Sequence, residues 1–568
     1  MTEEGEGRLV QRVMEDSMNT YDEREWVGLE EMLALSAADD VTIPKEQPVA
    51  VKEEVHEEQP VVAFPLELVG QRWTWSCTTM KMAQGVGAEP WCPTPSRSPK
   101  RESSPRGEVA QNDPLSCSAA EMKAVILPIC WFLSPLCLTL HHQSKHAFGT
   151  AETQEHQPTM AAPLAERSFD VIVVGAGIIG SCAAHAAASR GARVLLLERF
   201  DLLHQRGSSH GESRTTRPTY TRPQYPPMVR LAHRLWHDAE RDAGYTVLTP
   251  TPHLDLGPRD GPAFVAAIAN GGASELAPAG DASRPAWADA FRVPEGWAAA
   301  TSGPAGVIKA TKAMAMFQTL AAKMGAVVRD RAEVVDVARQ EGNTIVVKTS
   351  SGEEFHGGKC IITVGAWASK LVKSVTGADL PVQPVHTLVC YWRVKPGHEE
   401  ELTTEAGFPT FATYGDPGFY GTPSMEYPGL IKICRNGGPP CDPDGRDWAT
   451  GSGAGGIAEI VARWIDEFMP GHVDTAGGPV LRQPCMCCMT PDEDFVIDFL
   501  GGEQFGKDVV VGAGFSGHGF KMGPAVGKIL AELALDGQSG TAAEAGLELE
   551  HYRIGRFEGN PMGNATSH

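Results

Sequence analysis

A glycine-rich turn near residue 175 has the residue types that bind a phosphorylated cofactor. The motif Gly-x-Gly-x-x-Gly spans residues 175–180, after a β-branched apolar run and before an alanine-rich segment. In this setting the first glycine makes the tight turn, the second admits a pyrophosphate and the third lets helix pack on strand. The N–H groups that open the helix bind the phosphates. The expected contacts are Gly175, Gly177, Ile178, Ile179 and Gly180.

An acidic residue then selects among the dinucleotides. Glu198 ends the next apolar run, 18 residues after Gly180. A carboxylate at that position accepts hydrogen bonds from both ribose hydroxyls and disfavours a 2′-phosphate. The sequence therefore favours FAD or NAD over NADP, and the neighbouring Arg199 is expected in the same site.

A second glycine-rich turn favours FAD over NAD. Residues 512–521 read GAGFSGHGFK and precede a helix-like segment, while Gly365-Ala366-Trp367 follows another strand-like run. Backbone N–H groups at such a turn can bind the O2/N1 edge of a flavin, where charge accumulates on reduction. The alternative is a tight loop that only reverses the chain. The expected flavin contacts are Gly365, Trp367, Gly514, Phe515, Ser516, Gly517, His518, Gly519 and Lys521.

Alternating strand and helix patterns must position these turns. Residues 169–174 and 193–197 are strand-like and 181–190 helix-like, which predicts one βαβ unit. Further along, the pattern predicts a hairpin from residues 334–337 and 344–347, a strand over 359–364, and a last strand and helix over 508–511 and 524–535. The fold class expected is α/β, with a Rossmann-like FAD-binding domain.

The cofactor domain is expected to be discontinuous, with segments 165–245, 330–380 and 480–560. Residues 245–330 and 380–480 are rich in proline, glycine and aromatic residues and contain short strand-like runs. This composition is typical of an antiparallel α+β substrate domain inserted into the cofactor domain.

Residues 1–160 have a different composition. They include an acidic run at 53–58, a Pro/Ser/Arg-rich stretch at 93–106 and little periodicity, which predicts a low-complexity, mostly disordered extension. The apolar run 124–140 is short for a membrane span and is interrupted by Pro128 and Pro135. We expect a short helix or collapsed loop there, and no membrane association.

Composition limits the function classes. A chain of 568 residues with 42% hydrophobic content can form about two to four domains. The formal net charge of −22 argues against non-specific nucleic-acid binding, which needs a positive surface, and an anionic substrate would need locally placed cations. Thirteen cysteines without a secretory signal at Met1 indicate reduced thiols.

Three motifs resemble those of one enzyme family. They are GSSHGESRTTR at 207–217, CMCCMT at 485–490 and GFSGHGFK at 514–521. Together they resemble the monomeric sarcosine oxidase and N-methyltryptophan oxidase family, and most of all the plant peroxisomal sarcosine (pipecolate) oxidases. The resemblance extends from about residue 169 to 564 and implies an FAD-binding domain of the DAO/glutathione-reductase type.

The resemblance implies an FAD-dependent amine oxidase that acts on the CH–NH group of a small secondary amino acid. Sarcosine, pipecolate or a similar N-alkyl amino acid would give a hydride to the flavin, and dioxygen would reoxidise it to form hydrogen peroxide. One alternative is a flavin dehydrogenase of the same fold that uses another acceptor. The other is a catalytically weak flavoprotein or an interaction protein.

The resemblance also implies roles for five residues. Arg217 and Lys521 would bind the substrate carboxylate, because a guanidinium fork and an ammonium charge suit that anion. Lys432 would lie beside the flavin and promote its reaction with dioxygen, since a fixed cation stabilises superoxide. Arg214 would lie near the flavin face, and Tyr420 would supply a pocket hydroxyl. Further cofactor contacts are expected from Ser208, Ser209, His210, Val334 and Val335.

Cys485 has three possible interpretations. The resemblance implies that its sulfur carries the flavin through a thioether to the 8α-methyl group. From the residues alone, it could be an inert buried thiol. A metal site with Cys487 and Cys488 would lack the second Cys or His pair that completes four ligands, so no metal is expected.

Two positions depart from the family pattern. Asn436 stands where the family has a histidine, and Cys487 where a tyrosine usually closes the substrate pocket. Both leave the identity of the amine open. The resemblance further implies a monomer in the peroxisome, although the chain ends Ala-Thr-Ser-His without a Ser-Lys-Leu signal, and the alternative location is the cytoplasm.

Overall fold

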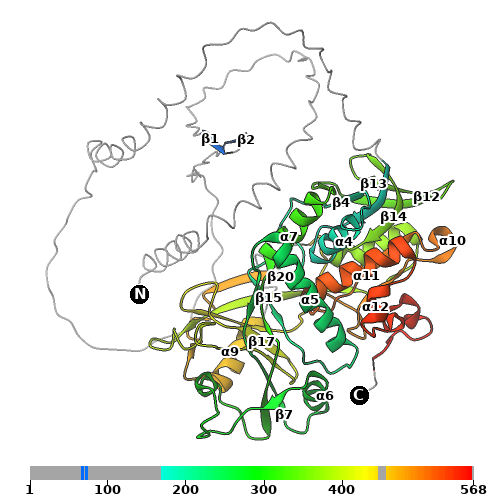
Figure 1. Ribbon diagram of the computed structural model, residues 1–568. Coiled ribbons are helices and arrows are strands. Elements are labelled where there is room, and N and C mark those ends of the chain that lie inside the picture. Colours follow the sequence, from blue (N-terminus) through cyan, green and yellow to red (C-terminus); the bar gives the residue numbers. More distant parts are fainter. Residues whose placement is uncertain (1–64, 69–70, 75–167, 446–455, 566–568) are drawn as a thin grey trace, which may run out of the picture. The chain divides into compact units, whose positions relative to one another are not determined.

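The computed structural model describes residues 65–68, 71–74, 168–445 and 456–565 (Figure 1). Strands β1 (Pro65–Leu68) and β2 (Gln71–Thr74) pair antiparallel and belong to a unit, residues 43–159, separate from the one that holds residues 160–568. The rest of the predicted disordered extension, including the run 124–140, lies outside the described residues. Within 168–445 and 456–565, no helix has the length and apolar content to cross a lipid bilayer.

An eight-stranded sheet forms the centre of the cofactor-binding half. Its parallel strands pair in the order β11, β4, β3, β14 and β22, and the antiparallel strands β13, β12 and β21 extend it. The bounds are β3 Ser168–Val174, β4 Val194–Leu197, β11 Val327–Arg329, β12 Val334–Gln340, β13 Thr344–Thr349, β14 Glu354–Ile362, β21 Val496–Phe499 and β22 Val509–Ala513.

Helices cover both faces of this sheet, because its parallel strands are apolar on both sides. Residues 171–174 of β3 are all buried. One face packs on four helices that lie together in Figure 1: α4 (Ile178–Ala188), α5 (Tyr225–Ala243), α7 (Ala310–Lys323) and α11 (Gly523–Asp536). The other face packs on α8 (Ala368–Thr376). The predicted βαβ unit, the hairpin and the last strand and helix are confirmed by these elements.

A nine-stranded, mostly antiparallel sheet forms the second half. Its strands pair in the order β19, β15, β18, β17, β16, β7, β9 and β8, with β20 along β15. The helix α9 (Ile457–Phe468) packs against it. The strands are β7 His253–Pro258, β8 Ser274–Glu275, β9 Trp297–Ser302, β15 Gln383–Val394, β16 Thr410–Thr413, β17 Phe419–Thr422, β18 Leu430–Arg435, β19 Val473–Asp474 and β20 Leu481–Met489.

The sheets divide the chain differently from the predicted domain boundaries at two places. Strand β20 follows residue 480 but pairs with β15, and β11 precedes residue 330 but pairs with β4. We propose that the cofactor domain resumes after β20 and that its middle segment begins near residue 305.

Three strands, β5 (Ser213–Thr216), β10 (Gly306–Lys309) and β6 (Leu248–Pro250), form a small separate sheet. The remaining helices are α6 Pro262–Gly271, η2 Ala286–Ala290, η3 Gly365–Trp367, α10 Gly502–Phe505, η6 Phe520–Met522, α12 Gly540–Glu544, η7 Leu549–Tyr552 and η8 Ile554–Phe557.

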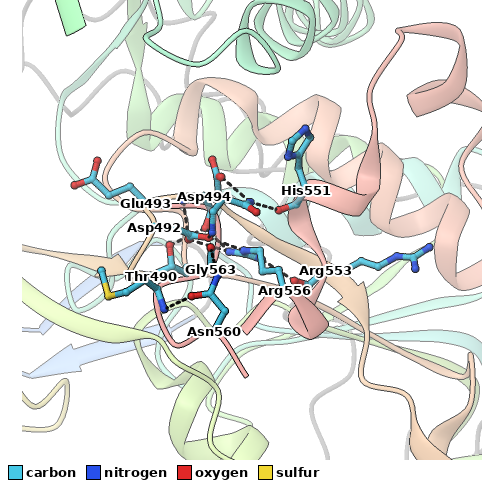
Figure 2. Close-up of polar contacts among 12 residues, drawn as sticks. Thr490, Asp492, Glu493, Asp494, His551, Arg553, Arg556, Asn560 and Gly563 are labelled. Atoms are coloured by element: carbon cyan, nitrogen blue, oxygen red, sulfur yellow. Dashed lines mark hydrogen bonds and ion pairs between the residues drawn. The ribbon is translucent and has the colours of Figure 1, made fainter. Parts of the chain in front are cut away.

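A buried ion pair attaches the C-terminal segment to the turn that follows β20. Figure 2 shows Arg556 directed at Asp492. The Nε and Nη2 atoms of Arg556 donate to Oδ2 and Oδ1 of Asp492, at 2.7 and 3.1 Å. Both side chains are almost fully buried, and the hydrogen bonds from Arg556 outweigh burial and lower the pKa of Asp492. The same turn contacts the glycine-rich segment, because the backbone N–H of Thr490 donates to Ser516 Oγ at 3.2 Å. The C-terminal segment is therefore linked to the glycine-rich turn through Asp492 and Thr490.

Replacing Arg556 with alanine should destabilise the protein strongly. Asp492 would remain buried without its cation, which typically costs about 3–5 kcal/mol of folding free energy. Denaturant titration of wild type and Arg556→Ala measures this loss. The matched control is Arg553→Ala, whose pair with Glu550 is exposed and worth less than about 1 kcal/mol. Equal losses in both variants would contradict the assigned role of the buried pair.

Candidate active site

A cavity of about 930 Å³ extends from the carboxyl ends of β3 and β4 to the nine-stranded sheet. Its volume lies at the upper end of the usual range for ligand and cofactor sites. Carboxyl ends of parallel strands are the usual place for a dinucleotide, because the loops there diverge.

The cavity collects almost all of the predicted site residues. The exceptions are Gly180 and Gly514, which lie behind its wall: a Cβ at Gly180 would overlap the carbonyl oxygen of Gly175, and one at Gly514 would overlap Thr490. These two glycines permit close packing and do not face the cavity. The predicted residues that line it are Gly175, Gly177, Ile178, Ile179, Glu198, Arg199, Ser208, Ser209, His210, Arg214, Arg217, Val334, Val335, Gly365, Trp367, Tyr420, Lys432, Cys485, Phe515, Ser516, Gly517, His518, Gly519 and Lys521.

One end of the cavity fits an adenosine diphosphate group. The carboxylate of Glu198 is held in place by the backbone N–H groups of Ala176 and Phe200, at 2.9 and 3.0 Å. The N-cap residue of α4 is Gly177, which has no side chain to cap the helix. The N–H of Ile178 donates to Ser209 Oγ at 3.1 Å. A fixed carboxylate beside a helix N-terminus is the arrangement that binds ribose and pyrophosphate.

Arg199 lies in a cluster of charges that sequence reasoning missed. Its guanidinium binds Glu333 at 3.0 Å and Asp444 at 2.9 Å. Asp444 also accepts hydrogen bonds from Trp367 Nε1 at 2.8 Å and Lys370 Nζ at 2.6 Å. Burial opposes the charge of Asp444, but these three donors outweigh it and lower its pKa to about 2. Because the partners are far apart in the chain, no local pattern could have predicted the cluster.

The two cations expected to bind a carboxylate share one tyrosine. Lys521 Nζ donates to the hydroxyl of Tyr220 at 3.0 Å, and the guanidinium of Arg217 lies 4.8 Å from the centre of the Tyr220 ring. Trp236 Nε1 holds the backbone of Lys521 by donating to its carbonyl oxygen at 2.8 Å. Burial, together with the charges of Arg217 and Arg214, lowers the pKa of Lys521 well below its usual range. An anion bound here would offset that repulsion.

Behind Arg217 lies a buried carboxylate that sequence reasoning also missed. Arg217 donates to the hydroxyls of Tyr414 and Thr219 at 3.0 and 3.2 Å, and also to the carbonyl oxygen of Thr219. Both hydroxyls in turn donate to Asp255 Oδ1, at 3.1 and 2.9 Å. His253 Nε2 lies 3.2 Å from the same oxygen. Although burial raises the pKa of Asp255, His253 and Arg217 outweigh it, so the carboxylate is ionised.

A sequence signal for this carboxylate does exist. His253 and Asp255 alternate with Leu254 and Leu256 in β7, so the two polar side chains share one face of the strand. Both are completely buried, and a buried polar pair on one strand face requires partners on a neighbouring element.

Lys432 and Arg214 meet at Ser213. Lys432, on β18, is buried, and its Nζ donates to the carbonyl oxygen of Ser213 at 2.9 Å and to its Oγ at 3.0 Å. Arg214 donates to the carbonyl oxygens of Ser208, His210 and Ser213 at 2.6–2.8 Å. Burial, with the charge of Arg214, lowers the pKa of Lys432. The backbone of one loop thus holds two cations at the cavity wall.

The positions that depart from the family pattern line the same cavity. Cys485 and Cys487 are two residues apart on β20 and therefore face the same side of the strand. Burial raises the pKa of the Cys487 thiol to about 12, and it also raises the pKa of Tyr420. The backbone N–H of Asn436 donates to Gly418 at 2.9 Å.

The fold and the cavity define an FAD-dependent oxidoreductase. A family model described as "FAD dependent oxidoreductase" (DAO) matches residues 170–533. A probable sarcosine oxidase of Arabidopsis thaliana is 51% identical over 405 residues, covering 70% of this chain and 95% of that protein. The peroxisomal sarcosine oxidase of Homo sapiens is 33% identical over 395 residues, covering 68% of this chain and 96% of that protein.

The chain therefore belongs to the monomeric sarcosine oxidase and N-methyltryptophan oxidase family of FAD-dependent amine oxidases, which confirms the resemblance. A solved structure of NikD, an unusual amino acid oxidase, has the same fold. It aligns with a TM-score of 0.57 and 22% identity, covering 71% of this chain and 99% of NikD. The predicted fold class is confirmed as well.

Removing the charge of Asp255 should weaken carboxylate binding. In Asp255→Asn, the hydroxyls of Thr219 and Tyr414 lose their anionic acceptor, so Arg217 is held less firmly. We expect the Kd of propionate, read from the flavin absorption spectrum, to rise about tenfold, or about 1.4 kcal/mol. The matched control is Ser302→Ala, which removes only a 3.4 Å contact with the other oxygen. An unchanged Kd in a folded Asp255→Asn protein would rule out this support of Arg217.

Proposed function

We propose that the protein is an FAD-dependent oxidase of a small secondary amino acid, such as sarcosine, pipecolate or a similar N-alkyl amino acid. Dioxygen would be the electron acceptor and hydrogen peroxide the product. The main support is the placement of Arg217, Lys521 and Lys432 around one cavity that also contains Cys485. Relatives that bear the name sarcosine oxidase support the same substrate class.

FAD bound in this cavity would accept a hydride from the carbon beside the substrate nitrogen and would then be reoxidised by dioxygen. The chain's own contribution begins with Arg217 and Lys521, which both contact Tyr220 and bind the carboxylate beside it. Their positive field also disfavours an ammonium group, so the substrate amine is held in its neutral form. Lys432 supplies a further fixed cation, which favours negative charge on reduced dioxygen.

The wall near Cys487 favours a larger amine than sarcosine. Cys487 stands where the family usually has a tyrosine, so its side chain leaves more room in the cavity. Asn436, in place of the family's histidine, is neutral at every pH. We therefore propose pipecolate or another cyclic secondary amino acid as a better substrate than sarcosine.

Covalent attachment of FAD through Cys485 is part of this proposal. Cys485 is buried, and its strand β20 lines the cavity beside the glycine-rich turn 514–519, whose Ser516 N–H donates to the carbonyl oxygen of Cys488 at 2.8 Å. A thioether to the flavin would raise its reduction potential and so favour amine oxidation. We also propose that the enzyme is a monomer located in the peroxisome, in line with relatives named peroxisomal sarcosine oxidase.

Anaerobic mixing tests the substrate class and the role of Lys432 together. Sarcosine, pipecolate and N-methyltryptophan are mixed in turn with the holoenzyme, and at least one should bleach the flavin. On exposure to air, the wild type should recover its colour and release one hydrogen peroxide per turnover. Lys432→Met should still bleach but should reoxidise about 10²–10³-fold more slowly, because it lacks the fixed cation.

Each outcome of this experiment is decisive. No bleaching by any of the three amines would exclude the substrate class, and bleaching without peroxide would indicate a dehydrogenase with another acceptor. Normal reoxidation of Lys432→Met would remove the assignment of that lysine. Lys507→Met, which changes a lysine outside the cavity, serves as the matched control.

Acid precipitation tests the covalent link. The wild-type pellet should retain the yellow flavin, and a mass spectrum should place it on the peptide that contains Cys485. Cys485→Ser should release all flavin into the supernatant, while Cys487→Ser, from the same strand face, should retain it. Release of flavin from the wild type would show that FAD is bound non-covalently.

A further inference from the structure

Three metal-ligating side chains meet at the edge of the nine-stranded sheet, and none of them lines the cavity. They are His398, Glu401 and His472, whose ligand atoms all lie within 4.8 Å of one another. Glu401 Oε2 is 2.9 Å from His398 Nδ1 and 3.2 Å from His472 Nε2. The two imidazole rings lie 4.3 Å apart, centre to centre.

Backbone hydrogen bonds hold the three residues in place. His472 lies between α9 and β19, and its carbonyl oxygen accepts the N–H of Lys395 at 2.7 Å, directly beyond the pairing of Val394 with Val473. The N–H of His398 donates to Lys395 at 3.1 Å, and that of Glu401 donates to His398 at 3.2 Å. The two chain segments are thus aligned by the sheet itself, so the ligands need little reorganisation.

The distances suit a tetrahedral metal ion. Ligands about 2.0–2.1 Å from Zn²⁺ lie about 3.3 Å from each other, close to the two distances measured from Glu401. Two imidazoles and one carboxylate are the donors of open zinc sites, in which water fills the fourth position. Calcium and magnesium prefer all-oxygen sites, so this donor set discriminates against them.

We propose that His398, Glu401 and His472 form a site for a divalent transition metal of the Zn²⁺ class. The ion would join the segment after β15 to the turn before β19. It would be open to solvent, since 35% of the His398 side chain and 14% of the His472 side chain are exposed. Strand β15 pairs with β18, which bears Lys432, and with β20, which bears Cys485. The metal would stabilise the end of this sheet without taking part in catalysis.

Zinc titration of the full-length holoenzyme tests the site. After chelator treatment and dialysis, Zn²⁺ is added against a chromogenic chelator. We expect the double variant His398→Ala/His472→Ala to bind one ion fewer per chain than the wild type. Excess Zn²⁺ should raise the Tm of the wild type by about 2 °C or more, and that of the double variant by less, because only a ligand bound to the native state stabilises it.

A second histidine cluster provides the matched control. On α5, His237 Nδ1 lies 3.1 Å from Glu240 Oε2, and the ring of His233 lies 4.9 Å from that of His237. Glu240 already accepts two backbone N–H groups with its other oxygen, at 2.7 and 2.8 Å. The double variant His233→Ala/His237→Ala should therefore keep the zinc stoichiometry and the Tm rise of the wild type.

Cobalt distinguishes this site from binding by thiols. Co²⁺ added to the wild type should give weak visible bands that are absent from His398→Ala/His472→Ala, without a thiolate charge-transfer band. Equal zinc stoichiometry and equal Co²⁺ spectra in the wild type and this double variant would overturn the proposal. Circular dichroism confirms that the variants are folded, which these partly exposed substitutions should permit.

Discussion

Positive charge concentrated in one cavity is the constraint on which the rest of the site depends. Arg214, Arg217, Lys432 and Lys521 line the same cavity, and burial lowers the pKa of both lysines. Such groups stay charged only if dipoles and anions face them. Loop carbonyl oxygens accept hydrogen bonds from Arg214, and Ser213 accepts them from Lys432. Tyr220 binds Lys521, and Asp255 is linked to Arg217 through Thr219 and Tyr414. The remaining positive potential is available to an anionic ligand.

This local field contrasts with the charge of the whole chain. The net charge of −22 belongs to the whole chain, so the carboxylate of the proposed substrate would be attracted by these cavity cations and not by the overall charge. Recognition therefore depends on short-range contacts inside a cavity of low dielectric, where fixed charges act strongly. Asp255 contributes to this local field indirectly. It orients Arg217 through two hydroxyls but does not line the cavity itself.

The two sheets contribute different parts of the cavity wall. The parallel sheet presents strand ends and the helix α4 to the dinucleotide, whereas the antiparallel sheet presents side chains of β17, β18 and β20 to the reacting end. Between them, the glycine-rich turn at 514–519 is supported by Thr490 and, through Asp492, by Arg556 in the C-terminal segment. The departure from the family pattern at Cys487 lies on this antiparallel sheet, which the proposed function makes the substrate side of the site.

Local patterns in the sequence determined the βαβ unit, both glycine-rich turns and Glu198, since turn geometry and strand periodicity depend on neighbouring residues. The motif resemblance added Arg217, Lys432, Cys485 and Lys521, which the structure brings to one cavity. Only the tertiary structure decided that Gly180 and Gly514 lie behind the wall, that β20 belongs to the antiparallel sheet, and that Asp255 and Asp444 act as partners. The physical reason is that these features depend on contacts between residues distant in the chain. The alternation in β7 marks Asp255 as a polar residue on one strand face but does not identify its partners.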